Sequence, residues 1–186
     1  MKEKLSTHYI AQWIVRYVKE KRDSELEQAV VRVLIGLVLI YYFKKIGFQH
    51  ASSSPSYTLS PVLIPSLFVI AATLMAVCVY FWPGEKHIRR TLSILMDVAP
   101  LTYLLIIGDS HAAPLCFLYQ WIVIGYGFRF GKNYLNIALV LALAGFGIVI
   151  ALAPFWQDDQ GLAVGLWLGT LTISMYSSTL IGRLAH

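Results

Sequence analysis

The stretch YLNIALVLALAGFGIVIALAPF at residues 134–155 contains no charged side chain. About 20 consecutive apolar residues in a helix are long enough to cross the hydrocarbon core of a bilayer. The run follows the polar segment 129–133 and ends before the acidic turn 157–160. This pattern predicts a transmembrane helix.

Five further apolar runs of this kind occur along the chain. They lie at about residues 26–48, 61–82, 91–107, 114–128 and 161–181. Hydrophobic residues make up 58% of the sequence and charged residues 13%, whereas soluble domains are about a quarter charged. A soluble enzyme, a disordered tail and a secreted disulfide scaffold are therefore excluded. We predict an all-α integral membrane protein with a six-helix transmembrane bundle.

The first 23 residues have a different character. Leu5 and Trp13 belong to an apolar stripe at helical spacing, while Arg16 falls on the other side. An amphipathic helix of this kind can lie in the headgroup region of a membrane, or it can pack as a solvent helix on the rest of the protein. We expect an N-terminal amphipathic interfacial helix and linker at 1–23, the bundle at 24–183 and a short junction at 184–186.

Positive charges are distributed unevenly between the predicted loops. With six spans both termini lie on one side, which carries 12 Lys and Arg residues against two, Lys44 and Lys45, on the other side. Loops rich in Lys and Arg stay in the cytoplasm, so we expect both termini to be cytoplasmic. The formal net charge of +5 then reflects orientation, and no nucleic-acid partner is expected.

Two ionisable residues fall inside predicted spans, where such groups are costly and are candidates for function. Arg32 lies near the cytoplasmic end of the first span, where its side chain could extend to the membrane surface. Asp97 lies about two turns into the third span from the same side. Because their depths are similar, the two residues could form an interhelical ion pair, with either a structural role or a role in sensing a ligand or a proton.

A second candidate region follows the fourth span. The segment Gly125-Tyr-Gly-Phe-Arg-Phe-Gly131 is not a dinucleotide-binding loop, because its spacing is not G-x-G-x-x-G and no strand precedes it. Arg129 can anchor the helix end at the lipid headgroups. Alternatively, Arg129 can hold an anionic headgroup, with Tyr126, Lys132, Asn133 and Tyr134 nearby, since arginine binds a carboxylate with two parallel hydrogen bonds. Membrane lipid is an expected partner in both cases.

The last span has a small residue at every fourth position, namely Gly161, Gly165 and Gly169. Small residues at this spacing let two helix backbones approach closely. We therefore expect these glycines to form a helix-packing surface, either within the chain or with a second subunit.

Recognisable catalytic motifs are missing from the sequence. It contains no H-E-x-x-H, no G-x-S-x-G, no P-loop and no cluster of residues with metal-ligand spacing. We therefore expect no catalytic residue, no metal site and no cofactor in these 186 residues.

Four segments together resemble the input region of RpfC-type sensor kinases. They are Arg22-Asp-Ser-Glu-Leu-Glu-Gln28 before the first span, Leu95-Met-Asp97 in the third, Gly127-Phe-Arg-Phe-Gly-Lys-Asn-Tyr-Leu135 after the fourth and Ala153-Pro-Phe-Trp156 at the end of the fifth. The resemblance covers about residues 20–185, and the order and spacing of the segments carry it.

The resemblance implies the sensor fragment of a hybrid histidine kinase in the bacterial inner membrane, with no catalysis of its own and with kinase domains following it. It implies a homodimer of the full-length protein and a fatty-acid signal molecule, the medium-chain cis-2-unsaturated diffusible signal factor of quorum sensing. By resemblance, signal recognition falls on Asp23, Ser24 and Glu25 in a periplasmic segment. The charge distribution instead predicts a cytoplasmic position for this segment.

Taken together, these features predict the membrane sensor of a two-component system, which transmits fatty-acid binding through its last helix to a cytoplasmic kinase. The main alternative is a small inner-membrane transporter or channel with Arg32 and Asp97 in its pathway. Transporters often contain inverted repeats and matched broken helices, and neither is apparent in this sequence.

Overall fold

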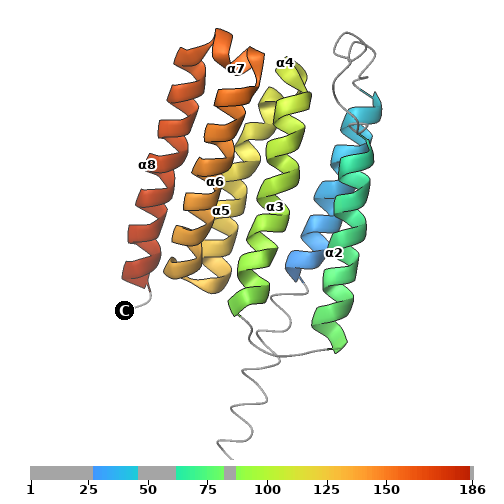
Figure 1. Ribbon diagram of the computed structural model, residues 1–186. Coiled ribbons are helices and arrows are strands. Elements are labelled where there is room, and N and C mark those ends of the chain that lie inside the picture. Colours follow the sequence, from blue (N-terminus) through green and yellow to red (C-terminus); the bar gives the residue numbers. More distant parts are fainter. Residues whose placement is uncertain (1–26, 46–61, 82–86, 185–186) are drawn as a thin grey trace, which may run out of the picture. The chain divides into compact units, whose positions relative to one another are not determined.

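The computed structural model describes residues 27–45, 62–81 and 87–184 (Figure 1). Within these ranges every regular element is a helix, and no β-strand occurs. The all-α prediction is therefore confirmed for this part of the chain. The predicted interfacial helix at 1–23 lies outside the described residues, and so do Asp23, Ser24 and Glu25.

Four described helices are long and apolar enough to cross a membrane. They are α2 (Leu63–Phe81), α3 (His87–Ile107), α6 (Lys132–Leu152) and the part Gln160–Arg183 of α8 (Gln160–Leu184). These helices correspond to the predicted second, third, fifth and sixth spans.

The other two predicted spans also fall on helical residues. The first corresponds to the helix at residues 27–45, which carries Arg32 and three charged residues close to its ends. The fourth corresponds to the 3₁₀ helix η2 (Ala113–Cys116) followed by α5 (Phe117–Phe130). These two elements together are about 29 Å long, close to the thickness of a bilayer core. The count of six spans stays a prediction.

The described chain forms two compact units. One unit contains the helix at residues 27–45 and most of α2, which pack closely at Gly36. A Cβ atom at that position would collide with the side chain of Val69 and press against that of Phe68. The other unit contains α3 to α8 and carries the candidate site.

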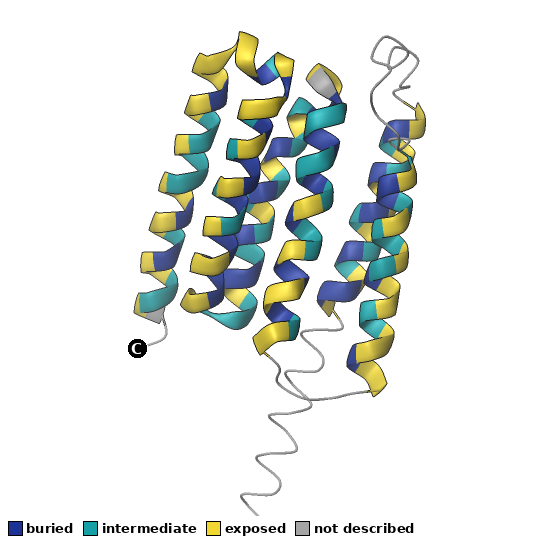
Figure 2. Ribbon diagram, viewed as in Figure 1, coloured by how far each residue is buried: buried dark blue, intermediate teal, exposed yellow. Residues whose placement is uncertain are grey.

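In the second unit, α6 packs against α3, α5 and α8, and α5 also contacts α3 and α8 (Figure 1). Buried residues line the sides on which these helices face each other (Figure 2). The centre of this core contains large side chains that are at most 1% exposed, among them Tyr119, Phe146 and Trp156. Large apolar side chains such as Val140 and Leu168 lie on the outside, as expected for a surface that lipid covers.

Short connections hold the helices of this unit together. Gly131 separates α5 from α6 and has φ +89°, a backbone conformation that favours glycine. Ala153 is extended, and Pro154 then begins the short helix α7 (Pro154–Asp158), where a missing N–H costs no hydrogen bond. Asp159 caps α8, because its Oδ1 accepts a hydrogen bond of 3.1 Å from the Leu162 N–H. A second short helix, α4 (Asp109–Ala112), follows α3 directly.

Candidate functional site

A network of three polar side chains joins α3 to α5. The Tyr126 hydroxyl lies 2.8 Å from Asp97 Oδ2 and 3.0 Å from Ser93 Oγ. Tyr126 and Ser93 are buried, and Asp97 is partly buried. A phenol has one proton and an ionised carboxylate only accepts hydrogen bonds. Tyr126 is the donor toward both oxygens, which share its one proton.

Arg90 is buried on the same side of α3, one turn before Ser93. Its guanidinium carbon lies 4.8 Å from the centre of the Phe130 ring and 5.6 Å from the centre of the Tyr134 ring. Arginine at this distance from aromatic faces makes a cation–π interaction. The Phe130 ring also lies 5.8 Å from that of Tyr126, so a row of aromatic rings connects Arg90 with the Tyr126 network.

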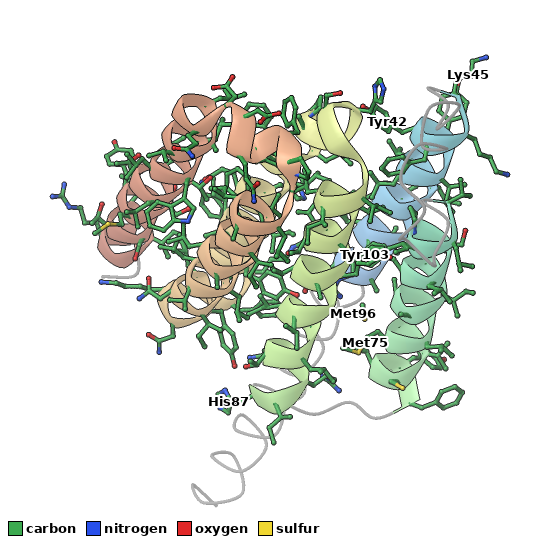
Figure 3. The ribbon with its side chains drawn as sticks, turned by 45° about the horizontal axis from the view of Figure 1, so that its top comes forward. Tyr42, Lys45, Met75, His87, Met96 and Tyr103 are labelled. Atoms are coloured by element: carbon green, nitrogen blue, oxygen red, sulfur yellow. The ribbon has the colours of Figure 1, made fainter. Side chains whose placement is uncertain are left out.

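His87 extends this group to the first residue of α3 (Figure 3). Its Nδ1 lies 2.6 Å from the Tyr134 hydroxyl, and the two rings stack with an angle of 9° between their planes. Tyr134 lies in the first turn of α6. The polar cluster, as we call this group, thus joins α3, α5 and α6. Its members are His87, Arg90, Ser93, Asp97, Tyr126, Phe130 and Tyr134.

The spacing of residues on α3 explains why the cluster forms. Arg90, Ser93 and Asp97 follow each other at intervals of three and four residues, so they lie along one face of the helix. Charged side chains inside a membrane bundle are costly, and they mark functional positions more often than charged side chains of soluble proteins do. Because the buried members Arg90, Ser93, Tyr126 and Tyr134 lie on three helices, a change in the charge or partner of one of them would alter how those helices pack.

The structure brings two of the predicted site residues together. Asp97 and Tyr126 share a hydrogen bond, whereas Arg129 lies half-buried in the last turn of α5. Arg32 is buried in the helix at residues 27–45, which belongs to the other unit. The proposed ion pair between Arg32 and Asp97 therefore stays a prediction.

Sequence reasoning missed Arg90 and Ser93. Arg90 fell into the predicted loop 85–90, because the third span was expected to begin at residue 91, whereas α3 begins at His87. The three- and four-residue spacing from Arg90 to Asp97 was a signal that could have identified one polar helix face. Tyr134 was noted only for its place near Arg129, since tyrosine is common at both ends of membrane helices.

A second polar contact joins the same three helices farther along α3. The hydroxyl groups of Thr102 and Tyr119 lie 2.7 Å apart, and Thr102 donates its proton to the Val98 carbonyl at 2.9 Å. Tyr119 must then be the donor to Thr102. Gly145 of α6 lies against this pair, and a Cβ atom there would be only 2.7 Å from Thr102 Oγ1. Glycine is therefore required for α6 to approach α3 and α5 here.

The glycine repeat of α8 makes little contact with the described residues. A Cβ atom at Gly165 or Gly169 would meet no atom within 4 Å, and one at Gly161 would only approach Asp159 at 3.9 Å. The surface predicted for close helix packing is thus not covered by any part of the chain that the structure describes. A partner for it would have to come from outside the described part of the chain.

Metal ligands do not gather in the described part of the chain. No three His, Cys, Asp or Glu side chains lie there in an arrangement that could hold a metal ion.

Among known proteins, the chain is similar to a sensory protein. No protein-family profile and no solved structure matches it. The sensory/regulatory proteins RpfC of two strains of Xanthomonas campestris pv. campestris are each 28% identical to it over 169 residues. The chain resembles RpfC along nearly its whole length. The match covers 91% of this chain but only 23% of each relative, so the chain spans less than a quarter of the curated relatives it matches.

These findings agree with the resemblance seen in the sequence. The similarity to RpfC supports an RpfC-like sensor region. Together with the apolar helices, it also supports a membrane protein. The transporter or channel alternative gains no support from any relative.

Proposed function

We propose that this chain is the membrane sensor region of a two-component histidine kinase in the bacterial inner membrane. The observation that carries the proposal is the similarity to a sensory/regulatory protein over 91% of the chain. The helical bundle gives such a region a way to detect a lipid-like signal within the membrane. The whole protein would contain a kinase, to which the last helix, α8, transmits the signal.

The proposed signal is a medium-chain cis-2-unsaturated fatty acid. Each CH₂ group of an acyl chain contributes roughly 0.8 kcal/mol when it is buried among apolar side chains, so a tail can bind along the apolar spans. Its carboxylate would be held near a membrane surface by arginine or hydroxyl groups. Asp23, Ser24 and Glu25 are proposed to take part in recognition or signalling, as the family resemblance implies.

Fatty-acid binding is tested by thermal unfolding of the purified chain in detergent. A cis-2-unsaturated fatty acid of C10–C14 at 100 times its Kd should stabilise the protein by about 2.7 kcal/mol, because it binds only the folded state. The methyl esters of the same acids are the matched control, since they keep the tail and lose the carboxylate. If no acid of the panel raises the unfolding midpoint, the proposed signal is wrong.

The orientation of the chain is tested separately. We propose that both termini are cytoplasmic, because one side of the predicted bundle carries 12 of the Lys and Arg residues. A cysteine introduced as Ser6→Cys, with Cys78 and Cys116 replaced by alanine, should stay unlabelled by a membrane-impermeant maleimide in spheroplasts and react after lysis. Labelling in intact spheroplasts would contradict this topology.

A second subunit is proposed to cover the glycine repeat of α8. A Cβ atom at Gly165 or Gly169 would meet none of the described residues within 4 Å, and small residues at this spacing support close helix pairs in membranes. In the full-length kinase, a dimer formed through this face would bring two copies of α8 together at the point where the signal leaves the membrane.

A further inference from the structure

Helix α8 packs against its neighbours differently from the other helices of its unit. Only 11% of its apolar stretch is buried, against 39% of that of α6. Three side-chain hydrogen bonds attach it to its neighbours: Gln120 of α5 to Ser174, Trp167 to the Leu143 carbonyl of α6, and Ser178 to Asn136 of α6. Polar contacts therefore help to fix its position beside the apolar packing of Leu166, Leu171 and Ile181 against the core.

The hydroxyl groups that face α5 and α6 are evenly spaced along α8. Thr170, Ser174 and Ser178 follow each other at intervals of four residues, which corresponds to about 6 Å along the helix. Ser174 contacts Gln120, with Nε2 3.2 Å and Oε1 3.4 Å from its hydroxyl oxygen, and Ser178 lies 3.3 Å from Asn136 Oδ1. Thr170 makes no such contact among the described residues, and instead donates to the Leu166 carbonyl of its own helix.

This even spacing means that α8 can form the same bonds in a second register. If α8 moves by four residues toward its own C-terminal end, Thr170 takes the place of Ser174 opposite Gln120. At the same time Ser174 takes the place of Ser178 opposite Asn136. The opposite movement would place Gly182 opposite Asn136, and that bond would be lost. We propose that α8 is a two-register output helix that moves about 6 Å toward its C-terminal end with a rotation of about 40°.

The movement is opposed at the start of α8, where Asp159 would enter the place of the fully buried Ala163, and at Trp167, whereas the contact at Gly127 accommodates it. Ile181 now packs at Gly127, with Cδ1 2.9 Å from the position of a Cβ. The movement would bring the smaller Ser177 there. Trp167 would lose its 3.1 Å bond to the Leu143 carbonyl and enter the place of the smaller Leu171. Trp167 therefore holds α8 in the register of the structure, and Thr170 is a positioning residue for the second one.

The proposal rests on the proposed function in one respect. It takes the movement of α8 to be the step that transmits the signal. One-turn shifts of one helix past another are a known mechanism of switching. In the orientation proposed above, the movement would push the end of α8 that carries Arg183 toward the cytoplasm.

The register is measured by electron–electron double resonance between spin labels at Phe128→Cys and Leu162→Cys, which replace exposed residues near opposite ends of α5 and α8. Cys78 and Cys116 are replaced by alanine, and the labelled chain is diluted with unlabelled chain in lipid nanodiscs. Because α5 and α8 are parallel, the second register should shorten the label distance by about 6 Å. Trp167→Phe should raise the population of the shorter distance at least about threefold, the effect of one membrane hydrogen bond.

Adding Thr170→Val to Trp167→Phe should reverse this increase, because the second register then lacks the partner for Gln120. Adding Thr172→Val is the matched control. Thr172 is exposed and donates to carbonyls of its own helix, so it should leave the two populations unchanged. If Trp167→Phe only loosened α8, the distances would broaden and both threonine variants would behave alike, and the proposal would be overturned. A single unshifted distance in Trp167→Phe would overturn it as well.

Addition of a cis-2-unsaturated fatty acid to the otherwise unchanged chain separates this proposal from the proposed function. A shift toward the shorter distance supports both. If the acid has no effect while the Trp167 and Thr170 variants respond as expected, the two-register helix stands and the proposed signal is contradicted.

Discussion

Replacing Tyr126 with phenylalanine is expected to lower the free energy of unfolding by about 2 kcal/mol, because it removes a hydrogen bond to a charged group. The Tyr126 hydroxyl contacts both Asp97 at 2.8 Å and Ser93 at 3.0 Å. Without this hydroxyl, the carboxylate of Asp97 loses a donor in a partly buried position between α3 and α5. Phenylalanine keeps the ring, so its contact with Phe130 remains. Equilibrium unfolding of the purified chain in mixed detergent micelles measures the effect.

Tyr176→Phe is the matched control for this prediction. Tyr176 is 65% exposed on α8, so loss of its hydroxyl should change stability by less than about 0.5 kcal/mol. Asp97→Asn tests the cause, because a neutral amide needs the phenol less than a carboxylate does. In a double-mutant cycle, Tyr126→Phe should cost at least about 0.5 kcal/mol less when residue 97 is Asn. Additive costs would contradict the role assigned to the Tyr126–Asp97 bond.

The positions of the spans could be predicted from the sequence because they depend on local composition. A run without charges predicts a membrane helix wherever it packs, and α2, α3, α6 and α8 overlap the ranges predicted for them. The predicted helix ends were less accurate, for physical reasons. The predicted fourth span began at Pro114, but that proline lies near the start of η2, and α5 begins only at Phe117. Gly131, with its positive φ, ends α5 after Phe130, whereas the predicted span ended at residue 128.

The contacts of the candidate site could be predicted only in part. Asp97 and Tyr126 were each selected from the sequence, Asp97 for its cost inside a span and Tyr126 for its place beside Arg129. Their hydrogen bond depends on how α3 and α5 are rotated against each other, and the sequence of one helix does not determine this rotation. The environment of Arg90 is also non-local, since Phe130 and Tyr134 lie on α5 and α6. Charge and spacing thus identify candidate residues, while packing decides which of them meet.

Replacing Gly145 with leucine is expected to destabilise the chain by about 3 kcal/mol, the upper range for overpacking a core. A Cβ atom at Gly145 would lie 2.7 Å from Thr102 Oγ1, 3.0 Å from Val98 Cγ1 and 3.3 Å from the Tyr119 hydroxyl oxygen. All three neighbours lie on α3 or α5, so the larger side chain would push α6 away from both helices. The unfolding midpoint measures the loss, and circular dichroism shows whether the chain stays helical.

Gly147 provides the matched control on the same helix. A Cβ atom at Gly147 would meet nothing within 4 Å, so Gly147→Leu should be neutral or stabilising by up to about 1 kcal/mol, because leucine favours a helix more than glycine does. If Gly145→Leu and Gly147→Leu lowered the stability equally, α6 would need glycine for a reason other than its approach to α3 and α5.

The source of the strain at Gly145 is tested with a smaller change. Thr102 Oγ1 is the atom nearest to the added Cβ, so Gly145→Ala should cost less in a Thr102→Ala background than in the unchanged chain. The difference should be at least about 0.5 kcal/mol, as for residues in direct contact. If the cost is the same in both backgrounds, the limiting contact is the one with Val98 rather than the hydroxyl pair of Thr102 and Tyr119. In that case apolar packing alone sets the distance between α6 and α3, and the hydrogen bond from Tyr119 to Thr102 only follows from it.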